Sequence, residues 1–190
     1  RTAGPRGPML MEDVWFQPVL NQDNSSGKVS VIMKVTAPEK QNVDARFVLT
    51  DREGTVITEK CLQLQGRDGI FTGTIHTDVQ NIKLWDNHSP YLYHACVELI
   101  EEKGGVLEVV PYDIGFRRLE IIDKVIYLNG KRLVITGVNR HEWNPKTGRC
   151  IGMQEMTADI DCMLRNNINA VRTCHYPDQI PWYYLCDKAG

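Results

Sequence analysis

The chain has 190 residues, enough for one large domain or two smaller ones. Apolar residues make up 42% of it and charged residues 24%, which is typical of a soluble globular protein, and the apolar runs are too short to cross a membrane. The formal net charge of -2 gives no basic surface, so we expect neither nucleic acid nor a membrane as a partner.

The first twelve residues are predicted to be a linker, since residues 1–8 read RTAGPRGP and have no hydrophobic periodicity. No charged segment followed by an apolar stretch is visible there, so the sequence shows no secretory signal. Six cysteines in a chain of this size do not require a disulfide framework. We expect reduced thiols and a cytoplasmic location.

Residues 13–122 alternate between apolar and polar side chains, the pattern of strands with one buried face. In 28–36, Val29, Val31, Met33 and Val35 form the core face, and Ile32 is the apolar exception on the other face. The same alternation recurs at 46–50, 56–64, 70–76 and 91–99. This part is predicted to be an all-β immunoglobulin-like sandwich of about seven strands.

Turn residues separate the predicted strands at 25–27, 51–54, 66–69 and 103–105. Trp15, Trp85, Tyr91 and Tyr93 are expected to belong to the core of the sandwich.

The pattern changes in residues 123–190. Asn129-Gly130 favours the positive φ angles of a tight hairpin between 125–128 and 132–135, and we expect the second arm to continue through Val138. An amphipathic helix is predicted over 155–166, with Met156, Ile160, Met163 and Leu164 on one face.

A short buried strand is predicted at 168–173, and a second helix begins at Pro181 and reaches Cys186, with Gly190 as its C-terminal cap. Strand, helix, strand, helix is the repeating unit of a parallel α/β fold. Residues 123–190 are therefore predicted to be the first two β/α units of a (β/α)8 TIM barrel, which cannot close a core alone.

Cys150, Cys162, Cys174 and Cys186 are spaced twelve residues apart, but no CxxC pair is present. The predicted elements place them in a loop, on two helices and at a strand end. We therefore predict no metal site and no cofactor in this segment.

Two long motifs resemble the first two strand-to-helix junctions of the family 2 β-galactosidases. They are ITGVNRHEWNPKTGR at 135–149 and NNINAVRTCHYPDQIPWYYLCD at 166–187. The stretches KLWDNHSPYLYHACVEL at 83–99 and DIGFRRLEI at 113–121 resemble the passage from sandwich to barrel in the same family. The resemblance implies a retaining glycoside hydrolase that cleaves terminal β-D-galactosides such as lactose.

The resemblance also implies roles for residues that follow the two strands, where TIM barrels carry their active sites. His141 and His175 match histidines that contact galactosyl hydroxyls, and Asn139 shares the first loop with His141. Arg172 matches an arginine near the nucleophile, where its fixed charge can hold a carboxylate in its ionised form. These four residues are the predicted substrate-binding set.

Glu142 also lies in the first loop but is not assigned as the acid, since in the family both catalytic glutamates follow later barrel strands, about 5 to 5.5 Å apart. The segment is therefore predicted to hold no catalytic carboxylate and to be inactive alone. For the full-length protein the resemblance implies magnesium and sodium ions, and we expect a homo-oligomer.

Three alternatives remain open. A β-glucuronidase or β-mannosidase would share this architecture. A non-catalytic carbohydrate-binding sandwich would expose Trp85, His88 and nearby tyrosines as a sugar platform, and an adhesive module would have no site at all. We expect Trp182, Tyr183 and Tyr184 to fill the layer between sheet and helix rather than to stack on sugar.

Overall fold

The computed structural model describes residues 9–37, 42–100 and 104–190. The chain divides into two compact units. The first comprises Leu92–Phe116 and the described residues before Leu84, and the second comprises Leu84–Tyr91 and Arg117–Gly190. None of the helices within the described residues is long and apolar enough to cross a membrane.

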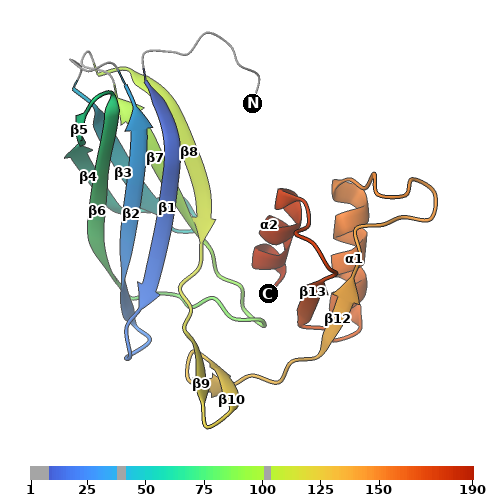
Figure 1. Cartoon of the computed structure of the whole chain (residues 1–190). Coiled ribbons are helices and arrows are strands. Elements are labelled where there is room, and N and C mark those ends of the chain that lie inside the picture. Colours follow the sequence, from blue (N-terminus) through green and yellow to red (C-terminus); the bar gives the residue numbers. More distant parts are fainter. Residues whose placement is uncertain (1–8, 38–41, 101–103) are drawn as a thin grey trace. The chain divides into compact units, whose positions relative to one another are not determined.

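The first unit is a β-sandwich of two antiparallel sheets (Figure 1). One sheet has the order β1-β2-β6-β5 and the other the order β4-β3-β7-β8. Their bounds are β1 Leu10–Leu20, β2 Ser26–Thr36, β3 Asp44–Thr50, β4 Val56–Gln63, β5 Gln65–Arg67, β6 Ile70–Gln80, β7 Tyr93–Ile100 and β8 Val106–Ile114. The predicted sandwich is confirmed, with eight strands in the described residues where about seven were expected.

The core of the sandwich follows the predicted alternation. Val29, Val31, Met33 and Val35 of β2 are buried, whereas Ile32 is exposed on the opposite face. Phe47 and Leu49 of β3 are also fully buried. The edge strand β4 differs from the prediction, because Val56 and Ile57 are exposed and the strand has no buried face.

Five local predictions for the sandwich are wrong. The linker predicted over residues 1–12 is too long, because Leu10 already begins β1. The turn predicted at 66–69 is shorter, because Gln65–Arg67 forms β5. The turn expected at 25–27 comes earlier, because Ser26 already begins β2. Trp15 does not belong to the core, since 60% of its surface is exposed. Trp85 and Tyr91 are buried, but both lie within the second unit.

Trp85 joins the second unit through its polar atoms and its ring. Its Nε1 donates to the backbone oxygen of Asp187 at 2.7 Å, and its own backbone oxygen accepts from Nδ2 of Asn129 at 3.0 Å. The Arg117 guanidinium lies 4.5 Å from the centre of the indole ring. Trp85 therefore contacts residues that come much later in the sequence. The alternation of side chains along one strand does not predict such contacts.

The second unit contains a small antiparallel sheet of β9 (Leu119–Ile122), β10 (Val125–Leu128) and β11 (Lys131–Arg132). The predicted hairpin is confirmed, and Asn129 and Gly130 have φ angles of 53° and 80°. Its second arm is shorter than predicted, because it ends at Arg132. Of the residues that were expected to extend it, 133–136 form no strand, and Gly137 and Val138 belong to a separate strand.

That separate strand, β12 (Gly137–Arg140), pairs in parallel with β13 (Ala170–Thr173), and each strand is followed by a helix, α1 (Met153–Arg165) or α2 (Ile180–Ala189) (Figure 1). The predicted order of strand, helix, strand, helix is confirmed. Ile151, Met156, Ile160 and Trp182 form the buried cluster between the helices. Leu164 departs from the predicted apolar face, since 47% of it is exposed.

The helix ends follow from local chemistry. A carboxylate oxygen of Glu155 accepts from the Gly152 backbone N–H at 2.9 Å and so satisfies a donor at the start of α1. Gly190 ends α2 with a φ of 104°, and its N–H donates to the Cys186 oxygen at 3.0 Å, as predicted. All six cysteines lie in the described part of the chain, and none forms a disulfide.

Candidate functional site

The candidate site lies where the parallel strands β12 and β13 end. Arg140 and Thr173 are register partners at the last position of each strand, and the Cys174 backbone N–H donates to the Arg140 oxygen at 2.8 Å. The two segments that follow β12 and β13 therefore leave the sheet side by side. The imidazole rings of His141 and His175 meet edge to face, with their centres 5.6 Å apart.

The other two predicted residues lie within the strands. Asn139 and Arg172 are register partners, so their side chains share one face of the two-stranded sheet. That face opens on a hollow of about 260 Å³ lined by both residues. The structure therefore brings the four predicted residues together in two adjacent pairs.

Arg172 has an unexpected neighbour. Its Nη1 donates to the sulfur of Cys174 at 3.2 Å, and Cys174 is buried while Arg172 is exposed. The predicted carboxylate partner of Arg172 stays a prediction.

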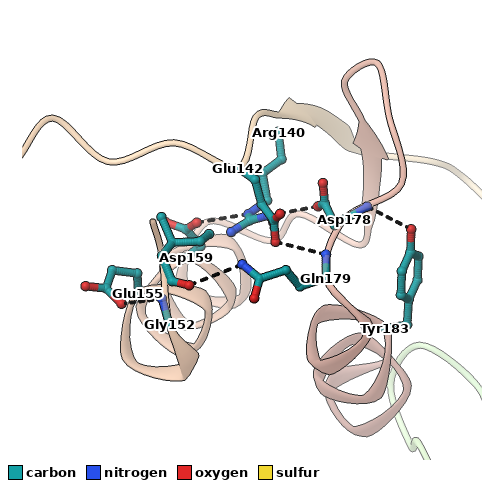
Figure 2. A network of polar contacts seen from close by, with 9 residues as sticks. Arg140, Glu142, Gly152, Glu155, Asp159, Asp178, Gln179 and Tyr183 are labelled. Carbon is teal, nitrogen blue, oxygen red and sulfur yellow. Dashed lines mark hydrogen bonds and ion pairs between the residues drawn. The ribbon is translucent and has the colours of Figure 1, made fainter. Parts of the chain in front are cut away.

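Arg140 points to the opposite face of β12 and is almost completely buried, with 4% of its surface exposed. Figure 2 shows its guanidinium at the centre of a polar network. Nη1 donates to Asp178 at 2.8 Å and Nε donates to Asp159 of α1 at 3.0 Å. The guanidinium carbon lies 3.8 Å from the centre of the Trp182 ring in α2.

Glu142 belongs to the same network rather than to the open face of the strands (Figure 2). Its carboxylate accepts from the Gln179 backbone N–H at 3.1 Å and lies 4.0 Å from Nη1 of Arg140. Gln179 also donates through its side chain to the Ile151 oxygen at 3.2 Å. Glu142 is buried and joins the two loops.

The sequence interpretation missed the partners of Arg140. One signal was present: the period of two in β12 puts Arg140 on the same face as Val138, toward the helices, where a charge requires a partner. Asp178 gave no such signal, because it lies in an irregular loop between Tyr176 and the start of α2. Tyr176 was also missed, and its ring centre lies 6.2 Å from that of His141.

A second hollow in this unit, of about 250 Å³, is lined mainly by apolar side chains of α1, β13 and α2 and by Trp85. None of the four predicted substrate-binding residues lines it. It lies in the layer between strands and helices, where gaps between apolar side chains need no functional explanation.

The aromatic residues that the carbohydrate-binding alternative requires to be exposed, around Trp85, are buried. Trp85, Tyr91 and Tyr93 are buried, which argues against a carbohydrate-binding sandwich that would expose them. Trp182 is also buried, as predicted, whereas Tyr183 and Tyr184 are exposed by 43% and 39%.

Within the described residues, His141, Cys174 and His175 are the group that could hold a metal ion, with one ligand atom of each within 4.8 Å of the others. These are nitrogen and sulfur donors, whereas Mg²⁺ and Na⁺ prefer oxygen. The group does not fit the ions that the resemblance implies for the full-length protein, and those ions stay predictions.

Two family models match the chain almost end to end. "Glycosyl hydrolases family 2" matches residues 10–117, and "Glycosyl hydrolases family 2, TIM barrel domain" matches residues 119–190. The chain is 47% identical over 179 residues to a "Beta-galactosidase large subunit" of Lactobacillus acidophilus, covering 94% of this chain and 28% of that protein. It is 60% identical over 112 residues to a protein of the same name from Lactobacillus helveticus, covering 58% of this chain and 18% of that one.

Among solved structures, a β-glucuronidase of Parabacteroides merdae superposes with a TM-score of 0.86 at 23% identity. The match covers 96% of this chain and 23% of that chain. At 23% identity this similarity shows the fold alone, and it includes residues of both units. The chain spans about a quarter of the length of these relatives.

Proposed function

Because the chain belongs to glycosyl hydrolases family 2, we propose that it forms part of a retaining β-galactosidase and supplies residues that hold the galactosyl group. The observation that carries this proposal is the meeting of His141 and His175 at the ends of two parallel strands, with ring centres 5.6 Å apart. The name and the 47% identity of the Lactobacillus acidophilus relative favour galactose as the sugar.

The fold supports separate locations for sugar binding and bond cleavage within the longer enzyme. We propose that β12, α1, β13 and α2 are the first two units of a (β/α)8 barrel. In such a barrel the carboxyl ends of all strands surround one site, so the acid and nucleophile can come from later strands. This chain then contributes binding rather than bond cleavage.

Each of the four residues has a chemistry suited to that task. The imidazoles of His141 and His175 can donate to or accept from sugar hydroxyls, and both side chains are exposed at the strand ends. Asn139 offers an amide with both donor and acceptor capacity. Arg172 adds a fixed positive charge that would favour the ionised form of a nearby nucleophilic carboxylate.

The proposal has two wider features, a cellular location and an oligomeric state. Six unpaired thiols suit a reducing compartment, and we therefore keep the cytoplasm as the proposed location. We also propose, from the family resemblance, that the full-length enzyme is a homo-oligomer.

A binding experiment on the chain itself tests the proposal. The histidine ring resonances of the labelled chain would be followed by NMR during titration with isopropyl β-D-thiogalactoside, and in parallel with methyl β-D-glucuronide. The galactoside should shift the signals of His141 and His175, and His141→Ala and His175→Ala should each weaken binding at least about tenfold, or about 1.4 kcal/mol.

The matched control is His76→Ala, which removes an exposed histidine of β6 in the sandwich and should leave binding unchanged. Galactoside binding that is insensitive to both strand-end histidines would refute their role. Preferential binding of the glucuronide would replace galactose by glucuronate as the proposed sugar.

A further inference from the structure

We propose that His141, Cys174 and His175 form a binding site for a thiophilic divalent cation, with Zn²⁺ as the ion of choice. One ligand atom from each residue lies within 4.8 Å of the other two. The residues come from the ends of two neighbouring strands, β12 and β13. His141 and His175 are also the proposed sugar ligands, so a bound cation and a sugar would compete for their imidazoles.

The spacing is close to that of a zinc site. Bonds of about 2.0 Å to nitrogen and about 2.3 Å to sulfur, arranged as a tetrahedron, put ligand atoms about 3.3 to 3.8 Å apart. The three atoms here need to approach by about 1.5 Å at most. Rotation of the two exposed imidazoles can supply this movement without displacing the backbone.

Cys174 is the fixed member of the group. Its side chain is buried, and its backbone N–H is held by the Arg140 oxygen at 2.8 Å. The Nη1 group of Arg172 donates to its sulfur at 3.2 Å and so orients it. On binding, the thiol would release its proton to solvent and form a bond between sulfur and zinc.

The donor set selects the cation. Two imidazoles and one thiolate suit Zn²⁺ and similar soft or borderline ions, whereas Mg²⁺ and Ca²⁺ require oxygen ligands. Three protein ligands leave a fourth position, which the exposure of both histidines keeps accessible to water. The charge of Arg172 beside the sulfur opposes the cation, so we expect micromolar rather than nanomolar binding.

The test is a metal titration of the purified, reduced 190-residue chain. Zn²⁺ binding would be measured by competition with a chromogenic chelator, and Co²⁺ would serve as a spectroscopic substitute. We expect one equivalent of metal bound with micromolar affinity and, with Co²⁺, an intense near-ultraviolet charge-transfer band from sulfur. Mg²⁺ in excess should not displace either ion.

Variants identify the ligands. Cys174→Ser should abolish the charge-transfer band, and His141→Gln and His175→Gln should each weaken binding at least tenfold. The controls Cys162→Ser and His76→Ala remove an exposed thiol and an exposed histidine elsewhere and should bind as the unmodified chain does.

The histidine variants decide the question even if Cys174→Ser impairs folding, because both imidazoles are exposed. Their circular dichroism and metal-free unfolding should match those of the unmodified chain. Binding of one equivalent with unchanged affinity in both histidine variants would overturn the proposal, as would a charge-transfer band that Cys162→Ser removes.

Discussion

Arg140 and Asp178 form a buried ion pair, with Nη1 and Oδ2 separated by 2.8 Å. The arginine ends β12 and the aspartate lies in the loop after β13, so the pair ties together the two segments that carry His141 and His175. Only 4% of the arginine side chain and none of the aspartate side chain is exposed. The pair is thus removed from solvent and should be sensitive to the loss of either member.

Asp178→Ala should destabilise the second unit by about 3 to 5 kcal/mol, because it leaves the Arg140 charge buried without its principal partner. Asp159→Ala is the matched control: this aspartate pairs with the same arginine at 3.0 Å but is 48% exposed, so its loss should cost at most about 1 kcal/mol. Urea unfolding of both variants measures the difference. Equal losses would contradict the special role of the buried pair.

Trp182→Ala should also destabilise this unit, by about 3 to 5 kcal/mol, since the indole is 1% exposed and packs on the Arg140 guanidinium. Trp143→Ala removes an indole that is 59% exposed and should change stability by less than about 0.5 kcal/mol. Far-ultraviolet circular dichroism in urea would compare the two. A small effect at Trp182 would mean that the cluster between α1 and α2 repacks.

The sequence predicted those elements whose residues repeat at a fixed period. The strand face of Val29, Val31, Met33 and Val35 and the helix face of Met156 and Ile160 followed from spacing alone, because burial selects apolar side chains at each return to the core. The same assumption, that apolar side chains are buried, wrongly placed Trp15 in the core. Hydrophobicity predicts a preference for burial, but an individual strand position can still face solvent.

The candidate site was predicted in part. The positions of His141 and His175 follow from chain order, because each comes just after a strand and parallel strands end at one edge. The Arg140 network could not be predicted in the same way, because Asp178 approaches the arginine through an irregular loop. Contacts of this kind depend on tertiary structure and leave no period in the sequence.

Cys186 should react slowly with thiol reagents at neutral pH. Burial raises the pKa of its thiol to about 11, so at pH 8 only about one molecule in a thousand carries the reactive thiolate. Cys150 and Cys162 are exposed and should be labelled first. Mass spectrometry of peptides from briefly alkylated protein tests this order, and labelling in denaturant, where all sites should react alike, is the control. Cys186 labelled as fast as Cys162 in the native state would contradict it.

Glu155 should make the stability of α1 depend on pH. The hydrogen bond from the Gly152 N–H, followed by that from its own N–H, lowers the pKa of this carboxyl below its ordinary value of 4.5. Its contribution is therefore fully present above pH 4.5 and is lost as the pH falls through the lowered value.

Thermal unfolding of Glu155→Gln across this pH range provides the measurement. The stability difference from the unmodified chain should shrink as the solution is acidified below pH 4.5. Asp161→Asn changes an exposed carboxylate of the same helix and controls for general charge effects. A difference that stays constant with pH would show that the carboxylate charge does not stabilise the helix start.

The purified chain should not hydrolyse nitrophenyl β-D-galactoside. Retaining hydrolysis needs two carboxyl groups about 5 to 5.5 Å apart, and Glu142 is held by the Gln179 N–H at 3.1 Å in the buried network. A sensitive absorbance assay, with Glu142→Gln as a control for contaminating enzyme, measures this. Turnover that disappears in Glu142→Gln would assign that residue a catalytic role and revise the proposed separate locations for sugar binding and bond cleavage.

The alternation along β12 restricts the length of the strand as well as its composition. Asn139 faces the hollow and Arg140 faces the helices, so inserting one residue between Gly137 and Asn139 would exchange the two sides. The guanidinium would then point away from Asp178, and an amide would replace it beside Trp182. Insertions and deletions among relatives of this chain should therefore be concentrated in the segment between His141 and Ile151, outside both strands, where a change in length leaves the two faces in register.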